Sequence, residues 1–257
     1  MTLVLVMHGT RDPAGAATAE EIAAAVARRL GGAVPVALAY ADVRPPGIAE
    51  VLAGLPLSGT PTVVVPAFLA AGYHVRVDVP REVARGGRSG VLVAEPLGPA
   101  AGAVAAVADR LAEAGRKPAD RVVLAAAGSS DSGARAEVRR AAAALSARLP
   151  GPVRTPVEVG YLATGQPSVE EAVAGLKAAG RTGDRVAVAS WLLAPGLFHR
   201  RALRSGAAVV SAPIGTHPLL IDLIARRYRA ALDGTGTESR ARRGPYHGYQ
   251  SLSGSPP

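Results

Sequence analysis

The sequence predicts an α/β protein with two similar doubly wound parallel-sheet lobes that arose by internal duplication. Apolar strand-like runs alternate with helix-like segments, and the second half of the chain repeats the motifs of the first. The strand-like runs are continuously apolar, which is typical of parallel sheets covered by helices on both faces. The repeated unit is too long for a solenoid, whose periods are roughly 20–50 residues, so each copy is a half of the molecule.

The elements of the first half follow from apolar runs and their breakers. Strands are expected where apolar and β-branched residues run without interruption, and helices where apolar residues recur at helical spacing. Gly31 and Gly32 stop the first helical pattern. The expected strands are 2–7, 34–41, 62–66 and 90–94, and the expected helices are 17–30, 46–55, 74–85 and 99–114.

The second half repeats this order after a linker near residues 116–120. Its expected strands are 121–126, 153–161, 185–191 and 207–211, and its expected helices are 134–148, 167–179, 198–205 and 217–232. We therefore divide the chain into a lobe at 1–115 that contains the active site and a second lobe at 116–232. Residues 233–257 are rich in Gly, Ser, Arg and Pro with little to bury, so a disordered basic tail is expected.

The two copies differ in the side chains that can do chemistry. The alignment starts from Gly9 and Gly128, which follow the first strand of each copy. Duplication followed by loss in one copy places the active site in the first lobe. Three residues have inert counterparts, with His8 falling on Ala127, Asp42 on Ala163 and His74 on Phe198.

His8, Asp42 and His74 each follow a predicted strand of the first lobe. The carboxyl ends of parallel strands meet at one edge of the sheet, where open α/β folds bind ligands. Two imidazoles and a carboxylate suit a divalent first-row metal ion. Imidazole is also the side chain best suited to accept a proton near neutral pH.

Other polar residues receive weaker assignments. Asp12 is expected to be a turn or cap residue, because Asp131 matches it in the lobe that lacks histidines. Asp78 lies one helical turn after His74 and either orients that imidazole or belongs to a solvated helix face. Among the remaining histidines, His199 is a candidate to face a cleft between the lobes, His217 is expected at the surface or as a cap, and His247 in the tail is assigned no role.

Composition limits the possible partners. The chain has 257 residues, 49% of them hydrophobic, no cysteine and a net charge of +9. No signal peptide or membrane span is recognisable, so a cytoplasmic protein is expected. The basic charge is compatible with nucleic acid, anionic lipid or a polyanionic small molecule. No nucleic-acid-binding motif is present, so we expect neither nucleic acid nor membrane as a partner. A monomer or small homo-oligomer is expected.

Two motifs resemble those of a known family. They are His8-Gly-Thr-Arg-Asp-Pro13 and the longer, more specific Pro66-Ala-Phe-Leu-Ala-Ala-Gly-Tyr-His74-Val-Arg-Val-Asp78-Val-Pro80. Together they resemble the sirohydrochlorin chelatases, often labelled CbiX-like, which are similar in fold to the ferrochelatases. The resemblance covers residues 1–232 as two fused copies, which is the long, two-lobed form of that family.

The resemblance implies an activity and a site. These enzymes insert Fe(II) or Co(II) into sirohydrochlorin, for sirohaem or cobalamin, without a nucleotide. His8 and His74 would bind the metal and assist deprotonation of the pyrrole nitrogens. Asp42 stands where relatives often have Glu, and its shorter side chain leaves its role open. The tetrapyrrole carries many carboxylates, for which the candidate contacts are Arg11, Arg44, Arg76 and Arg81, although a solvated face is an equal alternative for each.

Two other functions remain in competition at this point. A non-catalytic carrier of metal or tetrapyrrole would need the same ligands, so the sequence does not separate it from a catalyst. A histidine phosphatase is suggested by His8-Gly9, because those enzymes share an Arg-His-Gly motif. Met7 occupies the place of the arginine, and an apolar side chain cannot clamp a phosphate, which disfavours this alternative.

Overall fold

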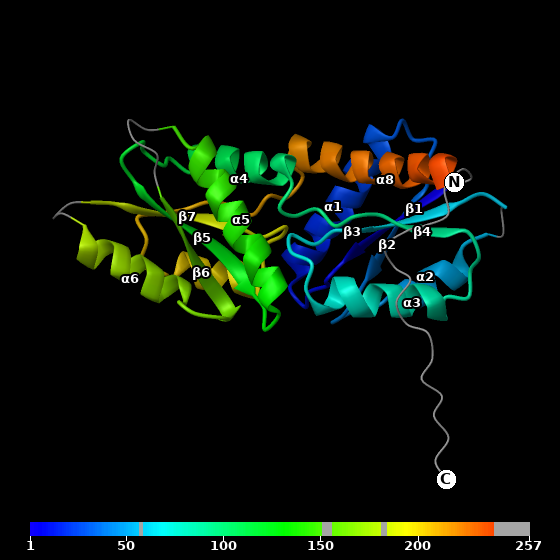
Figure 1. The fold of residues 1–257 in the computed structure, drawn as a ribbon, viewed down its shortest axis with the longest axis horizontal. Helices are drawn as coiled ribbons and strands as arrows, with labels where there is room; N and C mark the ends of the chain where they lie inside the picture. Colours follow the sequence, from blue (N-terminus) through cyan, green and yellow to red (C-terminus); the bar gives the residue numbers. More distant parts are fainter. Residues whose placement is uncertain (57–58, 151–155, 181–183, 239–257) are drawn as a thin grey trace, which may run out of the picture.

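Two parallel four-stranded sheets form the framework of the molecule (Figure 1). The computed structural model describes residues 1–56, 59–150, 156–180 and 184–238. The strand order is β2-β1-β3-β4 in the first sheet and β6-β5-β7-β8 in the second. The two orders are equivalent, so the predicted pair of similar α/β lobes is confirmed.

The first lobe ends with a helix that crosses to the other sheet. Its elements are β1 (Thr2–Met7), α1 (Pro13–Arg29), β2 (Val36–Tyr40), α2 (Ile48–Gly54), β3 (Thr62–Pro66), the π-helix η1 (His74–Asp78), α3 (Val79–Arg85), β4 (Val91–Val93) and α4 (Ala101–Glu113).

The second lobe repeats this arrangement, and three of its four strands are longer than their counterparts. Its elements are β5 (Arg121–Gly128), α5 (Ser132–Arg148), β6 (Val157–Thr164), α6 (Val169–Ala179), β7 (Val186–Trp191), α7 (Leu197–Leu203), β8 (Val209–Val210) and α8 (Pro218–Glu238). Helix α8 continues past Asp233, into the segment expected to be disordered. The rest of that expected tail, residues 239–257, lies outside the described residues.

Helix α1 starts earlier than the apolar pattern indicates. The Asp12 carboxylate accepts a hydrogen bond from the Ala14 backbone N–H, at 3.0 Å, and Pro13 occupies the first helical position. An N-cap aspartate and an early proline are both favourable at a helix start. Asp131 caps α5 in the same way, through the N–H of Ala134 at 2.8 Å. The expected structural role of Asp12 is therefore confirmed.

Strand β1 is apolar throughout because both of its faces are buried. Leu3 and Leu5 point into the core that includes α1 and α8, whereas Val4 and Val6 point into a second core under α2 and α3. All four side chains are fully buried. This two-sided burial produces the continuous apolar run that identified a parallel sheet.

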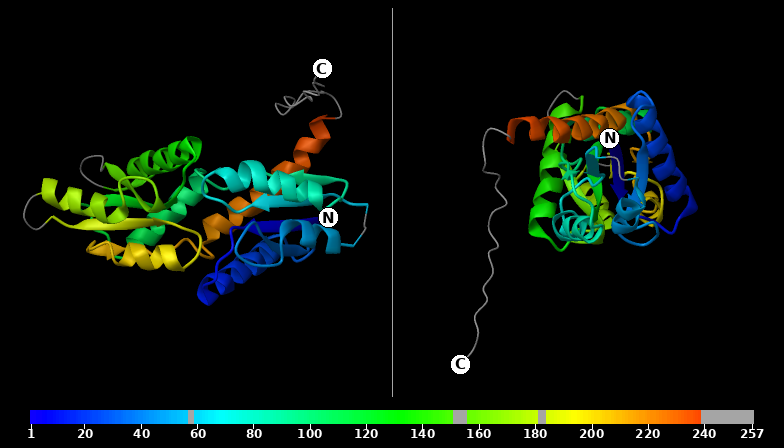
Figure 2. Two further views of the ribbon diagram at one scale, coloured as in Figure 1. Left: turned by 90° about the horizontal axis from the view of Figure 1, so that it is seen from below. Right: turned by 90° about the vertical axis from the view of Figure 1, so that its right-hand side faces the viewer.

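The last helix of each lobe packs on the sheet of the other lobe. Helix α4 lies against α5 and β7, and α8 lies against α1, β3 and β4. Figure 1 shows α4 over the second lobe and α8 over the first, and Figure 2 shows the two lobes from below and from the end. One core runs from Leu5 through α8 and α4 to Leu124. The exchange of helices therefore joins the lobes into one packed unit.

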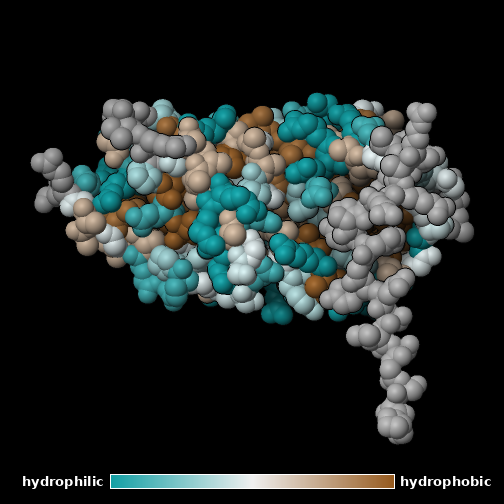
Figure 3. All heavy atoms as spheres, in the orientation of Figure 1, coloured by the Kyte–Doolittle hydropathy of each residue, from teal (hydrophilic) through white to brown (hydrophobic). Residues whose placement is uncertain are grey.

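The outer surface mixes polar and apolar side chains. Hydrophilic residues are spread over the face shown in Figure 3, with apolar residues between them. Among the described helices, none combines the length and the apolar character needed to cross a lipid bilayer.

Candidate metal centre

Three loops at the carboxyl edge of the first sheet bring His8, Asp42 and His74 together. His8 follows β1, Asp42 follows β2, and His74 begins η1 after β3. One ligand atom from each of the three side chains lies within 4.8 Å of the other two. The imidazole rings of His8 and His74 meet edge to face, with centroids 4.8 Å apart. The predicted triad is thus brought together in the structure.

Gly9 allows the ends of β1 and β2 to approach. Its φ is +99°, and an added Cβ would lie 2.2 Å from the carbonyl oxygen of Asp42. The backbone N–H of Asp42 donates to the His8 carbonyl at 3.0 Å. Gly128 has the same geometry in the second lobe, where a Cβ would lie 2.0 Å from the Thr164 carbonyl oxygen. The second lobe has therefore kept this backbone arrangement while losing the histidine.

Asp42 is followed by a strained tight turn. Val43 has a φ of 71°, a rare conformation for a β-branched residue. The Arg44 N–H donates to the Asp42 carbonyl at 2.8 Å, as in a γ-turn, and the Val43 N–H donates to the Asp42 Oδ1 at 2.7 Å. One carboxylate oxygen of Asp42 is thus fixed by its own backbone, and the other can face the imidazoles.

His74 is oriented by a buried carboxylate. Its Nδ1 lies 2.7 Å from Asp78 Oδ2, and the Arg81 guanidinium donates to Asp78 Oδ1 at 2.8 Å. Asp78 is 8% exposed. With Nδ1 occupied, Nε2 is the nitrogen of His74 that remains for a metal ion, as is usual for metal-binding histidines. Of the two roles considered for Asp78, orientation of the imidazole is the one observed.

The segment that begins at His74 is a π-helix rather than the start of an α-helix. The Val79 N–H donates to the His74 carbonyl, five residues back. Short π-helical turns occur frequently at functional sites. The expected single helix over 74–85 is therefore divided into η1 and α3.

The electrostatic environment favours a neutral His8. Desolvation by the surrounding protein lowers the pKa of His8, the nearby His74 lowers it further, and Asp42 acts in the opposite direction. At neutral pH the ring is therefore uncharged, which is the form that binds a metal ion or accepts a proton.

A cavity of about 1050 Å³ lies between the lobes next to this triad. The first lobe contributes His8, His74 and the exposed Tyr73, and the opposite wall contains Ala127 and Phe198, the counterparts of the two histidines. The two histidines of the triad therefore stand on one wall of the cavity, and their counterparts on the other wall have no imidazole. His199 also lines the cavity, as predicted, with its Nε2 3.2 Å from the Ser211 carbonyl.

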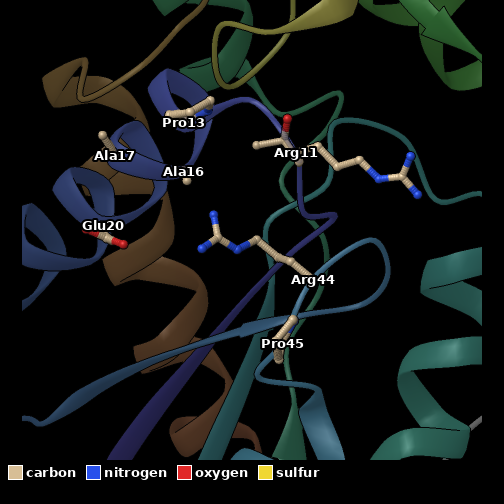
Figure 4. Close-up of a pocket in the computed structure, with 8 residues that line it drawn as sticks. Arg11, Pro13, Ala16, Ala17, Glu20, Arg44 and Pro45 are labelled. Atoms are coloured by element: carbon tan, nitrogen blue, oxygen red, sulfur yellow. The ribbon is translucent and has the colours of Figure 1, made fainter.

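The candidate arginines lie in different environments. Arg11 lines the main cavity and also an adjoining hollow of about 550 Å³. Arg44 lines only this hollow, with its guanidinium 5.1 Å from the centre of the Tyr40 ring. Figure 4 shows the Arg44 side chain directed toward α1 and the Arg11 side chain directed away from it. Arg76 is not among the described residues that line the main cavity. Arg81 donates a hydrogen bond to Asp78.

The remaining histidine assignments have mixed outcomes. His217 is 8% exposed, so the expected surface position is wrong. Its Nδ1 accepts the Leu219 N–H at 3.3 Å, at the start of α8, so the expected capping role is confirmed. His247 lies outside the described residues.

Two residues of the second lobe reach the His74 loop and were missed in the sequence. The Glu137 carboxylate accepts the Ala71 N–H at 2.7 Å, and the Trp191 indole N–H donates to the Leu69 carbonyl at 3.2 Å. Neither residue has a motif that marks it, and their proximity to the site follows only from the packing of one lobe on the other. Trp191 falls within one of the motifs that match between the two copies, but that match does not indicate its contact with Leu69.

Comparison with solved structures places the fold among chelatases. SirB from Bacillus subtilis with Fe³⁺ is similar over 91% of this chain and 97% of its own, with a TM-score of 0.71 and 24% identity. The sirohydrochlorin chelatase SirB from Bacillus subtilis subspecies spizizenii in complex with cobalt gives a TM-score of 0.65 at 23% identity, covering 91% of this chain and 97% of its own.

A third structure, described as CbiX, the terminal enzyme for biosynthesis of siroheme in denitrifying bacteria, has a TM-score of 0.65 and 23% identity, with 90% of this chain and 98% of that chain covered. No curated protein matches this chain. The CbiX protein family matches it twice, over residues 2–114 and 121–231. The two matches coincide with the two copies found in the sequence, and the chain belongs to the CbiX family.

Proposed function

We propose that this protein inserts Fe(II) or Co(II) into sirohydrochlorin, in the biosynthesis of sirohaem or cobalamin. The observation that supports this most directly is the cluster of His8, Asp42 and His74, with ligand atoms within 4.8 Å of one another beside the interlobe cavity. The structural relatives with Fe³⁺ and with cobalt support iron or cobalt as the metal substrate.

The ligand set suits a metal that must be released into a macrocycle. The three side chains come from one lobe, and His8 and His74 line the cavity, so the remaining coordination positions of a bound metal would open to it, unlike the closed four-ligand sites that hold structural metals. A tetrapyrrole nitrogen can then replace a water ligand while the metal is still held by the protein. No nucleotide is required, because the exchange of ligands is the driving step.

Metal insertion also requires removal of two pyrrole N–H protons. His8 is suited to accept one, because its lowered pKa keeps it neutral at physiological pH. His74 presents Nε2 to the same space and is held there through Asp78. The two imidazoles can thus serve first as metal ligands and then, as the metal leaves, as proton acceptors.

The cavity fits a large, flat, anionic substrate. Its volume of about 1050 Å³ is at the upper end of the usual range for small-molecule sites. Arg11, Arg135 and Arg200 stand on its walls, and cationic side chains at a rim help to capture polyanions. We propose Arg11 and, through the adjoining hollow, Arg44 as contacts of substrate carboxylates. The Arg76 role proposed from the resemblance would require this side chain to leave Glu137.

The proposal extends to the location, the partner and the oligomeric state of the protein. We propose a cytoplasmic enzyme whose partner is the tetrapyrrole, with no role for nucleic acid or membrane. Because both walls of the cavity come from one chain, a monomer is sufficient for function, and a small homo-oligomer would not need to share the site.

The test is an anaerobic absorbance assay with sirohydrochlorin and either Fe(II) or Co(II). The unchanged protein should accelerate the spectral conversion, and His8→Ala and His74→Ala should each reduce the rate at least about 100-fold, as expected for loss of a ligand that is also a base. His217→Asn is the matched histidine control, because the Asn side-chain oxygen can still accept the Leu219 N–H. Full activity in both alanine variants would refute the proposal.

A further inference from the structure

The loop that carries His74 is held from the opposite lobe. Residues 67–73 connect β3 to η1, and three points along this loop contact the second lobe. Leu69 accepts the Trp191 indole N–H, Ala71 donates to Glu137, and a Cβ on Gly72 would lie 3.4 Å from Ser129 Oγ. The first lobe also holds this loop, through the Leu97 and Gly98 N–H groups that donate to the Phe68 carbonyl, and the second lobe adds contacts at the end of the loop nearest to His74.

Glu137 makes the polar contact nearest to His74 in this set. Its Oε2 accepts the Ala71 N–H at 2.7 Å, and its side chain is only 13% exposed. A carboxylate that accepts a backbone N–H in a water-poor environment forms a short, charge-assisted hydrogen bond. Ala71 precedes His74 by three residues, so this bond fixes the backbone immediately before the metal-binding imidazole.

Two arginines surround the other carboxylate oxygen. Arg76 of η1 lies 3.9 Å and Arg140 of α5 lies 3.8 Å from Glu137 Oε1. The two guanidinium groups place positive charge beside this carboxylate oxygen. Arg76 also packs against Gly133 at the start of α5. Glu137 thus connects α5 to the chain on both sides of His74, at Ala71 and at Arg76.

We propose that Glu137 is a positioning residue for the metal centre, acting through its hydrogen bond to Ala71. In this arrangement the second lobe is retained as the support that sets the His74 imidazole at the correct distance from His8. The inference rests on the proposed metal-binding function, but it concerns affinity for the ion alone and needs no tetrapyrrole.

The test is titration of the full chain with Co(II), followed by the visible absorption of the bound ion. Glu137→Ala removes the acceptor, and its Co(II) affinity should fall about tenfold, as for other residues that orient metal ligands. Glu137→Gln keeps an oxygen that can accept the Ala71 N–H and should bind Co(II) as the unchanged chain does. Glu137→Asp keeps the charge, but its shorter side chain does not extend to the Ala71 N–H. Its Co(II) affinity should fall as that of Glu137→Ala does.

A matched control is Glu170→Ala, an exposed glutamate on α6 of the same lobe, which should leave binding unchanged. Thermal unfolding of each variant checks that it is folded. If Glu137→Ala does not fold, the Asp and Gln variants decide, because each keeps a polar group of similar size. A merely structural role would not alter the Co(II) spectrum of a folded variant.

Equal affinity in Glu137→Asp and the unchanged chain would overturn the proposal, and so would an equal loss in Glu137→Gln and Glu137→Asp. If the unchanged chain bound no Co(II), both the function and this inference would be refuted. If it bound Co(II) but inserted no metal into sirohydrochlorin, the proposed function would fail while the positioning role of Glu137 would stand or fall on the variants.

Discussion

Gly9 is the residue on which the geometry of the site depends most directly. A side chain there would collide with the Asp42 carbonyl, and the φ of +99° is unfavourable for any L residue. Because Gly9 sits between His8 and the loop that carries Asp42, a shift at this position would separate two of the three proposed ligands. The same requirement explains why Gly128 survives in a lobe with no ligands to position.

Substitution of Gly9 by Ala should therefore harm both stability and metal binding. We expect a loss of more than about 2 kcal/mol in the free energy of unfolding, because steric conflict adds to the conformational cost. Gly31→Ala is the matched control, since Gly31 also has a positive φ but an added Cβ would meet nothing within 4 Å. Its cost should be about 1–2 kcal/mol, with Co(II) affinity unchanged. Urea unfolding of both variants measures the difference, and equal losses would contradict this explanation.

At the scale of single residues, the sequence predicted which side chains meet at the edge of the first sheet. His8, Asp42 and His74 were found because three strands of a parallel sheet end at one edge and the second copy has lost all three groups. The strained turn at Val43 was not predicted, because nothing in a valine indicates a positive φ. The arginines were predicted less well, since long side chains take their final partners from tertiary packing, as Arg76 does from Glu137.

At the scale of elements, η1 couples His74 to Asp78. The π-turn places the two side chains in contact, and Arg81 on α3 completes the chain of polar contacts. A helical pattern over 74–85 predicted the segment but not its division, because a π-turn has the same apolar spacing as an α-helix over so few residues. The capped start of α1 was also missed, since Asp12 was interpreted as a turn residue or a cap without extending the helix to it.

Replacement of Asp78 by Asn should weaken metal binding while leaving the fold intact. Asn is similar in size, but it cannot stabilise the imidazole through a charged hydrogen bond. Loss of such a partner typically reduces metal affinity or activity about 10–100-fold. The measurement is Co(II) titration, with Glu170→Gln on α6 as the control, because Glu170 is exposed and belongs to the second lobe. Unchanged affinity in Asp78→Asn would mean that His74 is oriented by other contacts.

At the scale of the whole molecule, the exchange of α4 and α8 was beyond sequence reasoning. The periodicity of each helix shows an apolar face but not which sheet receives it. In the structure, Arg110 of α4 donates to the Ile214 carbonyl before α8, and Arg227 of α8 donates to the Pro96 carbonyl before α4. These reciprocal bonds join equivalent loops of the two copies. The proposed boundary at 115 therefore cuts across this packing.

Cutting the chain after residue 115 should show how far the first lobe depends on helix α8. A fragment of residues 1–115 lacks α8, so the face of β1 and β3 that α8 covers would be open to water. We expect this fragment alone to show no cooperative unfolding transition, and a mixture with residues 116–257 to recover one together with Co(II) binding. Circular dichroism during thermal unfolding is the measurement. A cooperative transition in the isolated first fragment would contradict the importance of the exchanged helix.

The central claim is that the triad of the first lobe catalyses metal insertion rather than only holding a metal or tetrapyrrole. The most direct test is a count of the sirohydrochlorin molecules metallated per protein molecule, measured anaerobically with a large excess of tetrapyrrole and of Fe(II) or Co(II). We predict many turnovers per chain, abolished by His8→Ala and by His74→Ala. Conversion that stops after one sirohydrochlorin molecule per protein molecule would contradict the account and identify a carrier.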